Sequence, residues 1–327
     1  MSREKTINLM RKELELRRKA PATRDSYLYW VRLFFLFVND KKVEEVNEED
    51  VKKFLEDLAI TKKVCVSTQN QAFCALLFLC RFVLSVELVS LKDGVRGKVR
   101  KKVPVVLSKS EVRQILDTLD PTHQLMVKLL YGAGLRISEC LSLRIKDLDF
   151  ENKMLIVRKG KGDKDRVTFL PGVVHEQLRE HLNKVKELHM KDLDNGLGGV
   201  FMPYALNRKF KKAAFDWKWQ WAFPSSRIEF NVDSSRHERM HLDKTILKHP
   251  LNRACYKIGI QKHVTPHIFR HSFATHLLMN GCDIRQVQEL LGHDSVETTM
   301  IYTHVLKSPG ISIVSPLDQI KRSRVPV

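Results

Sequence analysis

The chain has 327 residues, 43% of them hydrophobic, and a formal net charge of +19 at pH 7. This length allows two domains with separate cores, and the composition is that of an ordinary globular protein. We find no apolar run long enough to span a membrane and no apolar signal core, so we expect a cytosolic or nucleoid protein without a membrane partner. The six cysteines form no C-x-x-C pair and are expected to be reduced core thiols. The positive charge indicates a polyanionic partner, whose binding should weaken with salt.

Residues 1–91 are predicted to form a small helical bundle. Apolar residues recur at helical spacing in a segment that begins at Thr23, and Asn47 followed by three acidic residues is typical of a helix start. A third helical run begins at Ser67. Residues 92–107 are interpreted as an exposed basic linker between two domains. Its basic side chains are expected to contact DNA, and they include Lys98, Arg100, Lys101 and Lys102.

Residues 108–327 are predicted to form a second domain that combines helices with a small antiparallel sheet. Ser108 and Glu111 make a capping-box pattern at a helix start. Extended segments at 154–158 and 166–170 flank a glycine-containing turn and predict a β-hairpin. Residues 189–248 form an insert that is rich in glycine, aromatic and charged residues and holds three of the four tryptophans. The predicted fold class is mostly α with a small antiparallel β-sheet.

A motif at residues 265–271 could bind a phosphate. Thr265 and Pro266 suit the N-cap and first position of a helix. His267 and Arg270 would then share one face near a helix N-terminus, which favours anions. Arg270 can hold a phosphate through two hydrogen bonds. Taken alone, such a motif is more often a helix with a surface arginine and a hydrogen-bonded histidine.

Two further motifs extend this chemistry. Gly292 can end a helix, with His293 in the corner and Tyr302 on the next helix. Arg136 lies in the run G-L-R-I-S-E at 134–139 and supplies a second arginine. A lone tyrosine is usually a core or surface residue. Two arginines that clamp one phosphate, with a tyrosine able to attack it, indicate phosphoryl transfer on nucleic acid without a metal ion.

Together these motifs resemble those of the tyrosine recombinases, or phage-type integrases. That family has an arginine in a G-[LT]-R-x-[SG]-E turn, a lysine in a β-hairpin, H-x-x-R, [LV]-G-H and a tyrosine further on. The chain has matching residues in the same order, namely Arg136, Lys161, His267, Arg270, His293 and Tyr302. The resemblance implies an N-terminal helical core-binding domain and a mixed α/β catalytic domain that close on DNA as a C-shaped clamp. It also implies a tetramer on DNA in the bacterial nucleoid.

The resemblance assigns roles in strand cleavage. It implies that Tyr302 attacks the scissile phosphate, forms a 3′-phosphotyrosyl bond and releases a 5′-hydroxyl. Arg136 and Arg270 neutralise the charge that grows on the non-bridging oxygens, and His293 donates a hydrogen bond to the phosphate. Glu139 orients Arg136 or His267. No cofactor is implied, because the covalent bond conserves the energy of the phosphodiester.

Proton transfer is assigned in the same way. Lys161 is expected to protonate the leaving oxygen, since a lysine on a hairpin tip can reach it. Lys159 and Lys164 are close enough in sequence to take that role instead, and both are expected to contact DNA. His267 is the expected acceptor of the tyrosine proton or a phosphate ligand.

The insert narrows the resemblance to integron integrases, which recombine gene cassettes. In that family the insert contacts bases flipped out of folded single-stranded sites, and aromatic rings stack well on unpaired bases. The expected contacts are Trp219 first, and also Trp217, Trp221, His241 and Pro203. A helix core is the alternative for the tryptophans, and a recombinase of ordinary duplex sites is the alternative for the protein. The C-terminal tail, 307–327, is expected to dock on a neighbouring protomer, with Ile311, Ile313, Val314 and Leu317 as its anchors.

A competing motif lies inside the insert. His237, Glu238 and His241 form a literal H-E-x-x-H, the pattern of zinc metallopeptidases. That chemistry needs a helix, which would place both histidines on one face, and a third ligand. Polar, loop-like residues precede the motif, so a metal site is not expected there.

Overall fold

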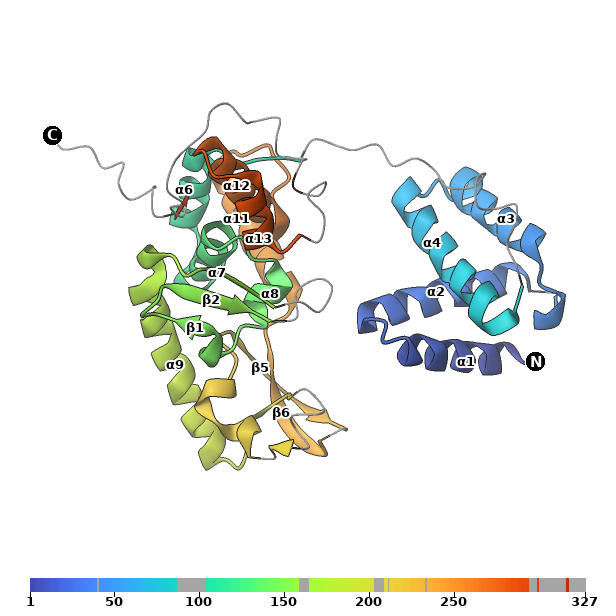
Figure 1. Ribbon diagram of the computed structural model, residues 1–327, viewed down its shortest axis with the longest axis horizontal. Coiled ribbons are helices and arrows are strands. Elements are labelled where there is room, and N and C mark those ends of the chain that lie inside the picture. The colour runs from blue at the N-terminus through green and yellow to red at the C-terminus, as the bar shows by residue number, and fades with distance from the viewer. Residues whose placement is uncertain are drawn as a thin grey trace. The chain divides into compact units, whose positions relative to one another are not determined.

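The computed structural model describes residues 1–39, 41–86, 104–158, 165–202, 209–210, 212–232, 234–293, 299 and 316–317. The chain divides into two compact units, Met1–Lys102 and Val103–Val327, which Figure 1 shows. Within the described residues, no helix has the length and apolar character needed to cross a membrane.

The N-terminal unit is a bundle of helices around an apolar core. Its α-helices are α1 (Arg3–Leu16), α2 (Pro21–Phe37), α3 (Glu48–Glu56) and α4 (Val66–Leu79), with a 3-10 turn, η1 (Val43–Glu45), and π-helical turns η2 (Asp57–Thr61) and η3 (Cys80–Leu84). The predicted start of α3 is confirmed, because Asn47 and Asp50 each accept the other's backbone N–H. Val31, Phe34 and Leu76 lie fully inside the core.

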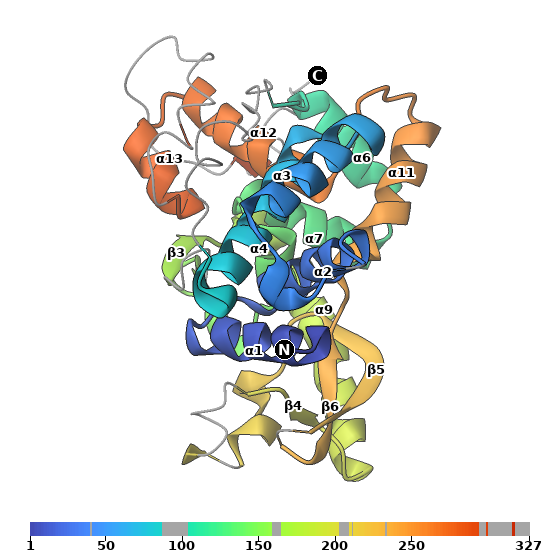
Figure 2. The ribbon, with the colours of Figure 1, turned by 90° about the vertical axis from the view of Figure 1, so that its right-hand side faces the viewer.

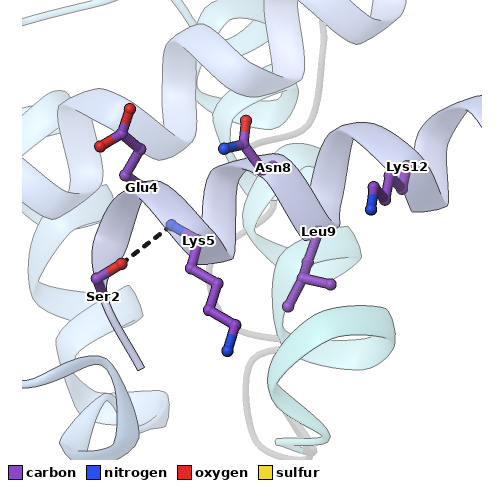
Figure 3. Close-up of a pocket in the computed structure, with 6 residues that line it drawn as sticks. All are labelled: Ser2, Glu4, Lys5, Asn8, Leu9 and Lys12. Carbon is purple, nitrogen blue, oxygen red and sulfur yellow. Dashed lines mark hydrogen bonds between the residues drawn. The ribbon is translucent and has the colours of Figure 1, made fainter.

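The first helix presents a polar face to the surface. Ser2 caps α1 by accepting the backbone N–H of Lys5, and side chains of this one helix line a shallow surface pocket (Figure 3). Its lining is Ser2, Glu4, Lys5, Asn8, Leu9 and Lys12.

The second unit contains most of the remaining helices and the first sheet. Its helices are α6 (Lys109–Thr118), α7 (Pro121–Gly132), α8 (Ile137–Leu141), η4 (Ile145–Asp147), η5 (Gly172–Val174), α9 (His175–Asp194), α11 (Lys248–Lys257), α12 (Pro266–Met279) and α13 (Ile284–Leu291). The predicted capping box at Ser108 and Glu111 is confirmed at the start of α6. Helices α7 and α12 form the centre of the core, where Tyr131, Phe269 and Phe273 are fully buried.

The first sheet contains the predicted hairpin. Its strands are β1 (Leu148–Asp149), β2 (Met154–Val157) and β3 (Arg166–Phe169), paired antiparallel in that order. Ile156 lies opposite Val167 in the hairpin register. The predicted fold class, mostly α with a small antiparallel sheet, is confirmed.

The insert forms a second sheet that the sequence did not predict. The insert contains the strands β4 (Gly199–Val200), β5 (Pro224–Asn231) and β6 (Arg236–His241) and the 3-10 turns η6 (Ala213–Phe215), η7 (Trp217–Trp219) and η8 (Lys244–Leu247). Strand β6 pairs antiparallel with β5 and parallel with β4. Helix α9 runs from the first sheet towards the second (Figures 1 and 2), and Asp192 near its end holds the buried Arg239 through two 2.6 Å hydrogen bonds.

The tail residue Leu317 lies in the core of its own chain. It is 4% exposed and packs against Gly132 at the end of α7. The expectation that Leu317 anchors on a neighbouring protomer is therefore corrected, because its apolar surface is already covered. The other predicted anchors of the tail lie outside the described residues.

Candidate active site and nucleic-acid interface

Arg270 is fixed at the centre of the candidate site by helix α12. The helix begins at Pro266 as predicted, with Thr265 extended before it, although Thr265 makes no side-chain cap. Most of α12 is buried, and the Arg270 side chain is only 5% exposed. Its guanidinium donates to the carbonyl oxygens of Gly134, at 2.5 Å, and of Leu291. These contacts join three segments that are far apart in the sequence.

Glu139 lies among three guanidinium groups. Arg136, just before α8, donates to it from the backbone at 2.8 Å and from the side chain at 2.6 Å. Arg166 donates two hydrogen bonds to the same carboxylate, at 2.9 and 2.7 Å, and Arg270 approaches within 3.6 Å. Burial opposes ionisation of Glu139, but the hydrogen bonds and charge of Arg166 outweigh it and lower its pKa to about 2. Three cations thus face one anion, and the surplus charge favours a phosphate.

The sequence motifs did not reveal Arg166. It lies on β3, and besides Glu139 it reaches the carbonyl of Leu290 at the end of α13 through Nε, at 2.9 Å. Gly292 leaves room for it, since a Cβ there would lie 2.8 Å from Arg166 Cδ, and Gly292 has a left-handed φ of +61°. The one available signal was an arginine in a short, mostly uncharged strand, since a partly buried arginine needs a carboxylate partner.

The two predicted histidines flank this cluster. His267 is on the first turn of α12, one turn before Arg270. Partial desolvation, reinforced by Arg270 and Arg136, lowers the pKa of His267, so the neutral imidazole that can accept a proton predominates at neutral pH. His293 follows the left-handed Gly292 that ends α13, and its Nδ1 lies 2.9 Å from Thr299 Oγ1.

Several predicted residues belong to segments that the structure does not describe. Lys161, Tyr302, Lys159, Lys164, Pro203, Lys98, Arg100, Lys101 and Lys102 lie outside the described residues. The structure therefore brings Arg136, Glu139 and Arg270 together by direct contact and places His267 and His293 on the adjoining elements. The positions of the proposed nucleophile and general acid stay predictions.

Gly134 allows the close approach of the Arg136 turn to α12. It has a φ of +65°, and a Cβ there would lie 2.5 Å from the buried Phe273 ring. We expect Gly134→Ala to lower the free energy of unfolding by about 2–4 kcal/mol, because it combines a left-handed backbone with overpacking. Urea unfolding measures this. Gly172→Ala is the matched control, since a Cβ at Gly172 meets nothing within 4 Å and should change stability by less than about 0.5 kcal/mol. Equal effects of the two changes would contradict the argument.

The three tryptophans of the insert differ in exposure. Trp221 is 6% exposed, and its indole N–H donates to the Arg239 carbonyl at 3.0 Å. The prediction that Trp221 contacts nucleic acid is therefore corrected, because its ring is part of the packing of the insert. Trp217 and Trp219 are half-buried, so each keeps accessible surface. His241 is also half-buried and packs edge-on against Trp221, with Nδ1 2.7 Å from the Leu242 carbonyl.

The H-E-x-x-H motif lies on strand β6, not on a helix. A strand spaces residues i and i+4 about 13 Å apart, so His237 and His241 cannot share one metal ion. Glu238 is 1% exposed and pairs with Asn231 and Arg236. Among the described residues, no group of three or more His, Cys, Asp or Glu side chains could hold a metal. The metallopeptidase alternative is overturned.

Comparisons with known proteins agree with this geometry. Residues 105–308 match the phage integrase family, and residues 7–89 match the phage integrase N-terminal SAM-like domain. The chain is 42% identical to an integrase/recombinase of Escherichia coli, over 97% of this chain and 94% of that protein. It is 33% identical to the tyrosine recombinase XerA of Thermococcus kodakarensis, over 89% of this chain and 88% of that protein.

A solved structure shares the fold. The XerH site-specific recombinase, bound to palindromic difH substrate in a post-cleavage complex, matches with a TM-score of 0.58 and 23% identity, over 88% of this chain and 78% of that chain. The family matches cover both units of the chain. The chain therefore belongs to the phage integrase family and is a tyrosine-type recombinase, an enzyme that cleaves and rejoins DNA strands.

Proposed function

We propose that this recombinase is an integron integrase, which integrates and excises gene cassettes at folded single-stranded DNA sites. The catalytic part of the proposal is supported by the cluster of Arg136, Arg166 and Arg270 around Glu139. Guanidinium groups that are already oriented before DNA binds stabilise a developing oxyanion without reorganisation. The substrate part is supported by the insert, which presents the partly exposed rings of Trp217 and Trp219.

The proposed cleavage step transfers one phosphoryl group. The Tyr302 oxygen attacks the scissile phosphorus and gives its proton to neutral His267, while the bond to the 5′-oxygen breaks. Lys161, or one of Lys159 and Lys164, protonates that oxygen. Arg136 and Arg270 carry the charge on the non-bridging oxygens. The products are a 3′-phosphotyrosyl bond and a 5′-hydroxyl, and the reverse steps rejoin a new strand.

We also propose a division of labour along the chain. Residues 1–91 are the core-binding domain, 92–107 the DNA-contacting linker and 108–327 the catalytic domain with its insert, 189–248, and tail, 307–327. Recombination of two sites requires four such protomers on DNA.

Covalent trapping on suicide substrates tests the proposal. A nick beside the cleavage site lets the released fragment diffuse away, so the protein–DNA adduct accumulates on a denaturing gel. The two substrates are a folded single strand with extrahelical bases and the fully paired duplex of the same site. We expect at least about tenfold more adduct on the folded strand, since one stacked base contributes about 1–3 kcal/mol. Addition of EDTA should not change the yield.

Each outcome discriminates among the alternatives. Equal adduct on the two substrates would favour a recombinase of ordinary duplex sites. Absence of adduct on both would contradict strand cleavage through a protein nucleophile. Loss of adduct in EDTA would contradict the proposal that arginines alone stabilise the phosphate.

A further inference from the structure

A lysine outside the insert covers the half-buried ring of Trp219. Lys146, in the turn η4, places Nζ 3.1 Å from the centroid of the Trp219 ring. Arg144, two residues earlier, places its guanidinium 3.8 Å from the Trp221 centroid and 5.5 Å from that of Trp219. Both cations belong to the segment that follows α8, so the tryptophans meet the catalytic body of the protein here.

Hydrogen bonds from the Arg144 side chain and from the main chain hold this contact in register. Arg144 donates to the carbonyls of Trp219 and Phe201, at 2.5 and 2.6 Å. The backbone N–H of Ile145 donates to Gln220, and that of Ala222 donates to Leu143. The pairing of residues 143–145 with residues 219–222 therefore positions both Trp219 and Lys146, and the fold itself fixes their contact.

The surroundings of Lys146 carry surplus positive charge. Burial, followed by repulsion from Arg158, lowers its pKa to about 8; Asp147 opposes this shift in part, and Arg144 and Lys218 add to the repulsion. The adjacent carboxylate, Asp147, is already engaged by the Arg158 guanidinium at 2.6 Å and by the Arg144 backbone N–H. Among the described residues, no carboxylate forms a salt bridge with Lys146. An incoming phosphate would supply a directly bonded counter-charge, which the distant attraction of Asp147 does not provide.

We propose that Lys146 and Trp219 form a nucleotide-binding pair that is capped in the free protein. When an unpaired nucleotide binds, its base replaces the ammonium over the indole ring and the ammonium moves to the phosphate of the same nucleotide. A base stacked on an aromatic ring is bound more strongly than a partly exposed ammonium, so the exchange is favourable. This inference rests on the proposed function, and it adds a residue outside the insert to the site that recognises extrahelical nucleotides.

The test measures binding of three DNA hairpins that differ at one position. The first carries one extrahelical base, the second an abasic nucleotide at that position, and the third no extra nucleotide. Lys146→Met removes the ammonium and keeps much of the side-chain volume. We expect it to weaken binding of the first hairpin about tenfold. The slope of log K against log salt concentration should become shallower by about 0.7–0.9, the value for one phosphate. Binding of the second hairpin should also weaken, because its abasic nucleotide still has the phosphate that Lys146 contacts. Binding of the third hairpin should not change.

Two further variants and a folding check serve as controls. Lys186→Met, which removes an exposed lysine from α9, should weaken all three hairpins equally or not at all. Lys146→Met should lose its additional effect on the first hairpin in a Trp219→Ala background, because base and phosphate bind as a unit. Thermal melting confirms that each variant is folded.

The contrary outcomes separate the inference from the function it rests on. If Lys146→Met tightens binding of the first hairpin or affects all three alike, the ammonium is only a cover or a general charge, and the inference is overturned. If the wild-type protein does not distinguish the first hairpin from the third, the proposed single-strand function fails instead.

Discussion

Tyr302→Phe is expected to abolish the covalent protein–DNA adduct and with it all strand transfer. Phenylalanine keeps the ring but lacks the oxygen that attacks phosphorus, so cleavage should fall by about 10³-fold or more. DNA binding should persist, because the change removes no charge and leaves the charges of the arginine cluster around Glu139 as they are. Denaturing gels of suicide-substrate reactions measure the adduct, and mobility shifts measure binding.

A matched tyrosine provides the control. Tyr256 on α11 is 91% exposed, and Tyr256→Phe removes one hydroxyl from the same unit of the protein. This variant should cleave like the wild type. An adduct that survives in Tyr302→Phe would show that another residue is the nucleophile, and loss of DNA binding in that variant would show that its effect is structural.

Glu139→Ala is expected to have the largest effect on stability. It leaves the buried Arg270 and the partly buried Arg166 and Arg136 without their shared carboxylate, and an uncompensated buried charge costs about 3–5 kcal/mol. Urea unfolding at pH 7 measures the loss. Glu187→Ala, which removes an exposed carboxylate from α9, should change stability by less than about 0.5 kcal/mol. A similar small effect at Glu139 would contradict its central role.

The effect of Glu139→Ala should also depend on pH. The folded-state pKa of Glu139 is lowered from 4.5 to about 2, so its contribution is fully present above pH 4.5 and is lost as pH falls towards 2. The stability difference between wild type and Glu139→Ala should therefore shrink over that interval. His276, whose burial lowers its pKa to about 4, destabilises both proteins alike as pH falls below 6.5 and cancels in the difference. A difference that stays constant down to pH 2 would show that Glu139 acts through packing.

Local signals predicted the elements that begin with a cap and the residues in short motifs. Asn47 and Ser108 mark true helix starts, since a capping box is made by residues three apart and can be read directly from the sequence. The contact between Arg136 and Glu139 also spans three residues. The two strands β2 and β3 were predicted because their largely apolar sequences flank a short segment that contains two glycines.

Local signals could not predict contacts between segments that are distant in the sequence. Arg166 meets Glu139 across 27 positions, and Arg144 meets the Trp219 carbonyl across 75. The H-E-x-x-H pattern was ambiguous because strand pairing, not local preference, sets the conformation of β6. Trp221 is buried for a similar reason, since its backbone bridges to Arg144, whose guanidinium covers the ring, and its indole N–H reaches the Arg239 carbonyl on β6.

The charge of the arginine cluster has a consequence for which state of the DNA it binds best. Three guanidinium charges less one carboxylate leave a net charge of two on Arg136, Arg166, Arg270 and Glu139. An intact phosphodiester carries one negative charge, whereas the same phosphate under attack by a phenolate carries two. The charge of the cluster is thus fully neutralised by the transition state, whereas the intact phosphodiester neutralises only half of it. Such a mismatch with the ground state directs binding energy into rate instead of into tight retention of uncut DNA.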